Sequence, residues 1–190
     1  MAVSAENVTV RGTPVLGLLH FVEQELAGEQ KRLVCSRIPA PWGERFAAVG
    51  VIASDRVPLT AVNALTRLAA EARGEDVERF AERAGLFAAR EGINTVFKPF
   101  FYILSVANAL SIAPLMWSRI YNAGQMRVDA RAKSGEIRIT GYPGDPAGCG
   151  RSTGWFRYIG ELSGARNFVV AHDVCTAKGA ENDVWTAHWD

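Results

Sequence analysis

Apolar residues recur at helical spacing along roughly the first two thirds of the chain. Beyond Pro14, a residue type that favours the first turn of a helix, the apolar face of the first predicted helix comprises Val15, Leu18, Leu19, Val22 and Leu26. The segment 58–74 begins at a proline and ends at a glycine, and the segment 77–92 follows Asp76, which is a typical helix cap. The sequence therefore predicts a helical part over about residues 12–124.

From about residue 125 the apolar pattern changes to a period of two. Two runs on either side of the letters KSG alternate apolar with polar residues, which predicts a hairpin; the apolar positions are Met126, Val128, Ala130, Ile137 and Ile139. A further helix is expected from about Cys149. A last hairpin pairs the letters RNFVVAHDVC with DVWTAHWD across a turn at Gly179.

These two patterns together predict the fold class. The helical part is expected to pack on a strand-rich part over residues 125–190, with the element order β-β-α-β-β and an antiparallel sheet. At 190 residues the chain is long enough to bury one sizeable core. We therefore expect a single α+β domain over residues 1–190.

Composition and charge exclude several classes of function. The formal net charge is +1 and no basic run is present, so nucleic-acid binding is not expected. Three cysteines make no disulfide framework and the first residues lack a signal pattern, which predicts a cytoplasmic protein. Polar residues and prolines interrupt the longest apolar stretch, 93–117, so no transmembrane segment is expected. No nucleotide-binding, kinase or metalloprotease motif occurs, which favours a protein that is not an enzyme.

The same apolar stretch carries the first candidate site. Its aromatic residues cover several faces of the expected helix, which is compatible either with ordinary core packing or with a pocket for a small apolar or aromatic ligand. The candidate pocket residues are Phe97, Phe100, Phe101, Met116, Trp117 and Trp155. His20 lies within an apolar helix and is interpreted as a packed residue rather than a haem ligand.

The second candidate site lies in the last 45 residues. Cys149 is expected near a helix start, His172 and Cys175 flank the end of one strand, and the last hairpin returns Asp183 beside them. These residue types are accepted metal ligands. The alternatives are that the cysteines are buried small apolar residues with a satisfied histidine, or that Cys149 is a hydrolase nucleophile activated by His172 and oriented by Asp173 or Asp183.

The segments LMWSRIYNAGQMRVDA and GCGRSTGWFRYIGELSGARNFVVAHDVC resemble the 4-vinyl reductase-type small-molecule-binding domain, whose fold is shared with TRAPP vesicle-tethering subunits. Over its whole length the chain also resembles a myxobacterial paralogous family of uncharacterised function. The resemblance implies a TRAPP-like fold and a homodimer. It also implies a structural zinc on Cys149, His172, Cys175 and Asp183, where His172 and Asp183 depart from the ligands of the related phenol sensors.

The sequence thus predicts a non-catalytic small-molecule sensor or regulatory interaction module that signals to a separate effector protein. The alternative from another class is a scaffold or partner-binding subunit without a ligand, as in the TRAPP subunits. A cysteine-dependent hydrolase is the third alternative. An open cavity among the aromatic residues would favour the sensor, and a closed apolar core would favour the scaffold.

Overall fold

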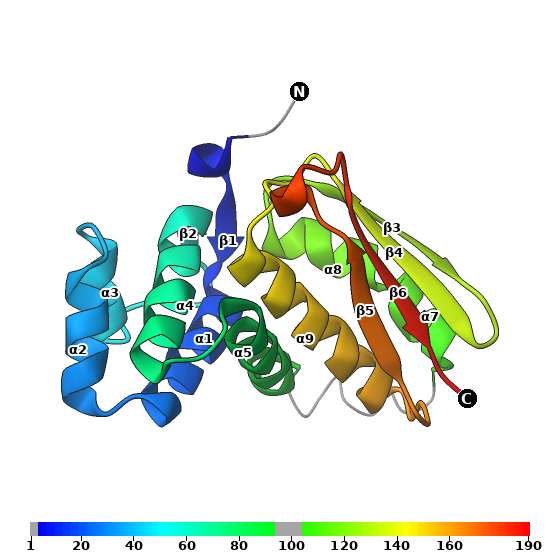
Figure 1. Ribbon diagram of the computed structural model, residues 1–190, viewed down its shortest axis with the longest axis horizontal. Coiled ribbons are helices and arrows are strands. Elements are labelled where there is room, and N and C mark those ends of the chain that lie inside the picture. Colours follow the sequence, from blue (N-terminus) through cyan, green and yellow to red (C-terminus); the bar gives the residue numbers. More distant parts are fainter. Residues whose placement is uncertain (1–3, 94–103) are drawn as a thin grey trace.

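The computed structural model describes residues 4–93 and 104–190, and it shows a helical part beside a sheet (Figure 1). Pro99 and the aromatic residues around it lie outside the described residues. The helices are α1 (Gly12–Glu25), α2 (Gly28–Ser36), α3 (Trp42–Ala47), α4 (Leu59–Arg73), α5 (Val77–Gly92), α7 (Val106–Ser111), α8 (Ala113–Ile120) and α9 (Pro146–Leu162), with the short 3-10 turns η1 (Ala5–Asn7) and η2 (Thr176–Lys178).

Local signals in the sequence set the ends of the long helices. Gly74 ends α4 in the left-handed conformation, with φ +64°, where a side chain would be strained. The carboxylate of Asp76 caps α5 by accepting a hydrogen bond of 3.0 Å from the backbone N–H of Arg79. Both predicted helices are confirmed.

The described strands form two sheets. A four-stranded antiparallel sheet in the order β3-β4-β6-β5 follows the helical part; its strands are β3 (Gln125–Ala130), β4 (Ser134–Thr140), β5 (Val169–Val174) and β6 (Asp183–His188). The predicted order β-β-α-β-β is therefore confirmed. A small sheet of β1 (Thr9–Arg11) and β2 (Arg56–Pro58) was not predicted, because three-residue strands leave no periodic signal.

Glycines bring α9 into close contact with α5, and α9 lies between α5 and the sheet (Figure 1). A Cβ atom on Gly150 would come within 2.5 Å of the carbonyl oxygen of Glu78, and one on Gly154 within 2.0 Å of that of Glu82. On the other helix, a Cβ atom on Gly85 would meet the carbonyl oxygen of Arg151 at 2.1 Å. The two helix backbones therefore touch directly.

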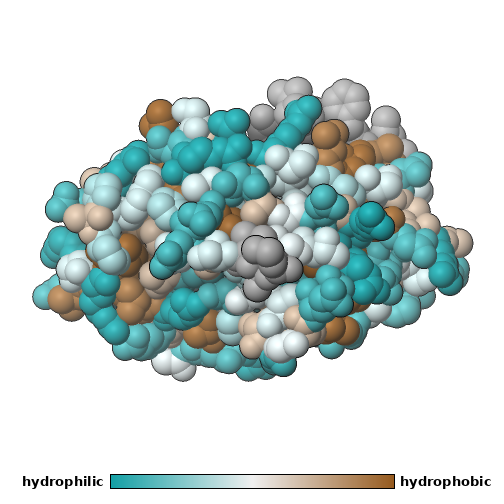
Figure 2. Space-filling model, turned by 90° about the horizontal axis from the view of Figure 1, so that it is seen from above, coloured by the Kyte–Doolittle hydropathy of each residue, from teal (hydrophilic) through white to brown (hydrophobic). Residues whose placement is uncertain are grey.

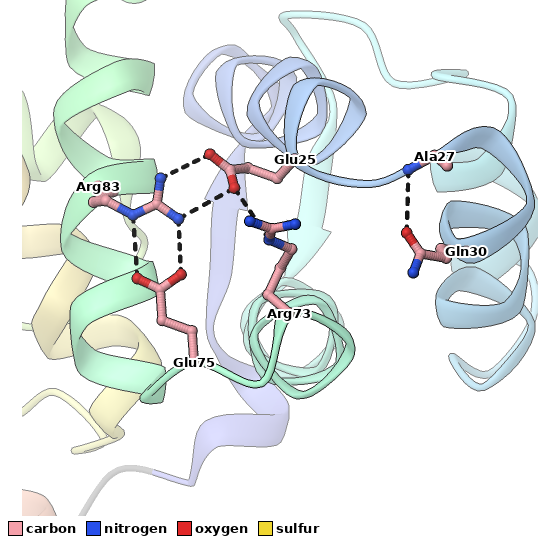
Figure 3. Close-up of polar contacts among 6 residues, drawn as sticks. All are labelled: Glu25, Ala27, Gln30, Arg73, Glu75 and Arg83. Carbon is pink, nitrogen blue, oxygen red and sulfur yellow. Dashed lines mark hydrogen bonds and ion pairs between the residues drawn. The ribbon is translucent and has the colours of Figure 1, made fainter.

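An ion-pair network joins the C-terminal ends of α1 and α4 to α5 (Figure 3). Arg83 of α5 donates hydrogen bonds to Glu25 of α1 and to Glu75 in the α4–α5 turn, with shortest distances of 2.7 and 2.8 Å. Arg73 of α4 lies 3.4 Å from the Glu25 carboxylate. These contacts, above all the hydrogen bond from Arg83, lower the pKa of Glu25 although its burial acts in the opposite direction.

The buried apolar residues form two clusters. One lies among α1, α2, α4 and the start of α5, and the other lies between α9, α7, α8 and the inner face of the large sheet. None of the described helices is long and apolar enough to cross a membrane. Seen from above, the surface is mostly hydrophilic, and its hydrophobic side chains stand in small separate groups (Figure 2).

Candidate functional site

A cavity of about 430 Å³ lies where α1, α5, α8 and α9 meet, between the two apolar clusters. We call it the central cavity. Its described lining is mainly apolar, with small residues on α5 and larger ones on α8 and α9. The apolar lining residues include Val15, Leu18, Ala88, Ala89, Ile93, Ala113, Ile120 and Phe156. A cavity of this size and character is typical of sites for small molecules.

Three of the six predicted pocket residues line the central cavity. Met116 and Trp117 reach it from α8, and Trp155 reaches it from α9. The indole N–H of Trp117 is held by a hydrogen bond of 3.1 Å to the carbonyl oxygen of Ala123. The other three predicted pocket residues lie outside the described residues; they are Phe97, Phe100 and Phe101.

Two tyrosines stand beside Trp117 at one side of the central cavity. The ring centroids of Trp117 and Tyr121 are 4.1 Å apart, and that of Tyr142 is 5.3 Å from Tyr121. Burial raises the pKa of both tyrosine hydroxyls. Both therefore stay neutral at physiological pH.

Arg151 is the charged residue of α9 that lines the cavity. Its Nη1 donates a hydrogen bond of 2.7 Å to the hydroxyl of Thr66, and its Nη2 donates to the side-chain oxygen of Asn63. Burial lowers the pKa of Arg151, although the neighbouring tyrosines act in the opposite direction. A guanidinium is nevertheless charged at neutral pH.

The four residues of the second candidate site do come together. Donor atoms of Cys149, His172, Cys175 and Asp183 lie within 4.8 Å of one another, a spacing that could hold a metal ion. Without a metal ion their hydrogen bonding is only partly satisfied, because the buried Nε2 of His172 has no hydrogen-bond partner among the described residues. The buried Asp183 carboxylate accepts hydrogen bonds of 2.9 and 2.8 Å from the backbone N–H and hydroxyl of Thr176, and the Cys149 sulfur lies 3.7 Å away.

His172 completes this network. Its Nε2 lies 3.3 Å from the Asp183 carboxylate, and its ring stacks on Trp185 with a centroid distance of 4.2 Å. Burial acts to raise the pKa of Asp183, but the neighbouring His172 and the hydrogen bonds from Thr176 outweigh it and hold that pKa below its usual value. The carboxylate is therefore ionised at neutral pH.

The environment of Cys149 does not favour a nucleophile. Burial strongly raises the pKa of its thiol, and the nearby charge of Asp183 raises it further. Cys149 was expected near a helix start, and it lies in the first turn of α9, which begins at Pro146 with Asp145 as its cap. Because only the thiolate attacks a substrate, the hydrolase alternative loses its support.

The comparisons with known proteins concern the fold. No protein-family model matches the chain, and no curated protein matches it. Solved structures that resemble it include an H-NOX protein from S. oneidensis in the Fe(II)NO state (TM-score 0.72, 9% identity, 95% of this chain and 99% of that one). Another is an unliganded Fe(II) H-NOX mutant from K. algicida (TM-score 0.73, 9% identity, 95% of this chain and 96% of that one). A third is an oxygen-binding H-NOX domain related to soluble guanylate cyclases (TM-score 0.63, 11% identity, 95% of this chain and 95% of that one).

The chain therefore has the H-NOX fold, and the expected resemblance was wrong. The helical part and the antiparallel C-terminal sheet are confirmed, but the 4-vinyl reductase and TRAPP-like assignment is not. The two segments that carried the resemblance follow a β-β-α-β-β order, and the H-NOX fold has the same order. The order alone therefore did not distinguish the two folds. The names of those H-NOX structures describe Fe(II), NO and oxygen bound by those proteins.

The assignment of a structural zinc was also wrong. It rested on the overturned resemblance, and the structures that share the fold are described by heme and Fe(II) instead. Binding of a metal ion by the four C-terminal residues stays an untested prediction. The expected homodimer has lost its basis in the same way.

Among the described residues, the lining of the central cavity offers heme iron neither histidine nor cysteine. Iron in heme proteins is usually held by histidine or cysteine. All three histidines and all three cysteines of the sequence belong to the described residues, and none lines the central cavity. His20 instead contacts Glu91 at 2.7 Å on the surface. Met116 and Tyr121 are the remaining described candidates: methionine usually ligates heme iron together with a histidine. Burial raises the pKa of the Tyr121 hydroxyl, which disfavours the phenolate that would ligate iron.

Sequence reasoning missed the polar residues that hold Arg151. A signal was present, because Asn63 and Thr66 lie three residues apart among the apolar positions of a predicted helix. Both are buried, with 3% and 0% of their surface exposed. Buried polar residues at helical spacing indicate a polar partner from another element.

Proposed function

We propose that this chain is a non-catalytic sensor module that holds a small apolar molecule in the central cavity. The observation that supports the proposal is the mainly apolar cavity of about 430 Å³ between the two parts of the fold. Names of structures with the same fold describe ligands at iron, but the residues of this chain favour a ligand bound without iron.

The position of the central cavity suits a sensor. Its lining comes from α1 and α5 of the helical part and from α8 and α9, which pack on the sheet. A molecule in the cavity would therefore contact both parts and bias how they pack. The state with ligand bound would be read by a separate effector protein.

Decan-1-ol is a suitable probe of the proposal, because it is apolar and carries no charge. Trp117 and Trp155 line the cavity, so binding should change the tryptophan fluorescence of the full chain. We expect saturable binding at one molecule per chain. Met116→Trp should weaken it about tenfold or more, because the larger side chain occupies the cavity.

Leu115→Trp is the matched control. Leu115 is adjacent in sequence, is 56% exposed and does not belong to the described lining of the cavity, so its substitution should leave binding unchanged. If the wild-type protein binds neither decan-1-ol nor a charged probe with the same hydrocarbon chain, or if both variants bind decan-1-ol as the wild type does, the sensor proposal fails. The first of these results would favour the ligand-free scaffold.

A further inference from the structure

The described lining of the central cavity carries positive charge and no negative charge. Arg11, Arg119 and Arg151 are its charged members, and no aspartate or glutamate is among the lining residues described. Within the described part of the chain, none of the three arginines forms an ion pair with a carboxylate. The cavity is thus mainly apolar, and its positive charge lacks a carboxylate partner among the described residues.

Arg151 is the inner member of this set. It is half-buried on α9, whereas Arg11 and Arg119 are exposed. Its two hydrogen bonds go to neutral oxygens, those of Thr66 and Asn63. A guanidinium has five N–H donors, so it retains the capacity to bind an acceptor in the cavity.

The surroundings of Arg151 fix its position without neutralising it. Thr66 and Asn63 are buried on α4, and the Thr66 hydroxyl donates to the carbonyl oxygen of Val62 at 2.9 Å, which leaves its lone pairs for Arg151. Asp145, at the start of α9, pairs with Arg67 instead. Asn63 and Thr66 are therefore positioning residues for a charge that has no counter-ion in the described part of the chain.

We propose that the ligand of the central cavity is an apolar molecule with one carboxylate group, and that Arg151 binds this carboxylate. The inference rests on the sensor proposal and names the class of its ligand. The apolar lining would take the hydrocarbon part, and Arg11 and Arg119 add positive charge at exposed positions of the same lining. A planar guanidinium matches a carboxylate in geometry and in charge.

Decanoate and decan-1-ol test this inference, because they share a hydrocarbon chain and differ in the charge of one end. The wild-type protein should bind decanoate about tenfold or more tightly than decan-1-ol, as expected for a hydrogen bond between charged groups out of water. Arg151→Gln should remove most of this preference and leave the affinity for decan-1-ol unchanged. Arg151→Lys keeps the charge and should retain part of the preference.

Arg157→Gln is the matched control, because Arg157 lies on the same helix and pairs with Glu82 away from the cavity. It should leave the preference intact. Equal affinity of the wild-type protein for both probes, or an unchanged preference in Arg151→Gln, would overturn the inference while the sensor proposal stands. Binding of neither probe by the wild-type protein would overturn both.

Discussion

The Asp183 carboxylate lies at the centre of the C-terminal polar network. It is 1% exposed and receives hydrogen bonds from Thr176, while Cys149 and His172 lie beside it. These four residues come from α9, from the end of β5, from η2 and from β6. A single buried charge thus joins the last hairpin to the helix beneath it.

Asp183→Asn tests this network at the residue scale. The amide keeps the shape of the carboxylate but loses its charge and presents an N–H₂ group to neighbours that donate. We expect the free energy of unfolding to fall by about 2–4 kcal/mol, measured by urea denaturation at neutral pH.

Asp129→Asn is the control for this substitution. The Asp129 side chain is 70% exposed and its contact with Arg131 at 3.5 Å is on the surface, so its loss should change stability by about 0.5 kcal/mol or less. An equally small effect at Asp183 would show that the polar network does not stabilise the fold.

At the scale of elements, the contact of α5 with α9 depends on glycines. Glycine inside a helix lowers helix stability by about 1 kcal/mol relative to alanine. The glycines of these helices are nevertheless required, because the carbonyl oxygens of Glu78, Glu82 and Arg151 occupy the places where a Cβ atom would lie. Packing between helices here outweighs helix propensity.

Gly154→Ala should therefore destabilise the protein although alanine favours helices. We expect a loss of about 1–3 kcal/mol or more in thermal or urea denaturation, because the new methyl group would lie 2.0 Å from the Glu82 carbonyl oxygen. Gly28→Ala, at the start of α2 with no atom within 4 Å of the new Cβ, should change stability by about 0.5 kcal/mol or less. A stabilising effect at Gly154 would contradict the packing described.

Many features of the helices and strands were predictable from the sequence. The boundaries of α4 and α5 follow from Pro58, Gly74 and Asp76, which act on their own neighbours in the chain. The glycine contacts were not predictable, because Gly154 and Glu82 are 72 positions apart and nothing local to either indicates the other.

At the scale of the whole molecule, the fold and the cavity lead to different expectations about heme. Structures with this fold are described as heme proteins, but no histidine or cysteine of this chain lines the described part of the cavity. A chain with this fold can therefore lack a histidine or cysteine in the described lining of its cavity. A fold shared at 9% identity need not keep the residues that hold a cofactor.

We expect that ferric heme added to the purified protein acquires no absorption spectrum of iron bound by histidine or thiolate. Tyr121→His is an informative variant, because it places an imidazole in the lining of the central cavity. A histidine-type spectrum in the wild-type protein would contradict the conclusion that no histidine of the described cavity can bind heme iron. The same spectrum in Tyr121→His alone would support it.

The sequence by itself determined the types and ends of the long elements, the α+β class and the convergence of Cys149, His172, Cys175 and Asp183. The elements and the class depend on apolar periodicity and on caps, which act over short distances along the chain. The convergence also needs the last hairpin to pack on α9, where Cys149 and Asp183 meet across 34 positions. Only the tertiary structure decided that a cavity exists, that Arg151 meets Asn63 and Thr66 across 85 or more positions, and that no histidine lines the described cavity. Filled and open cavities have the same composition, so which side chains share a space depends on how the elements pack.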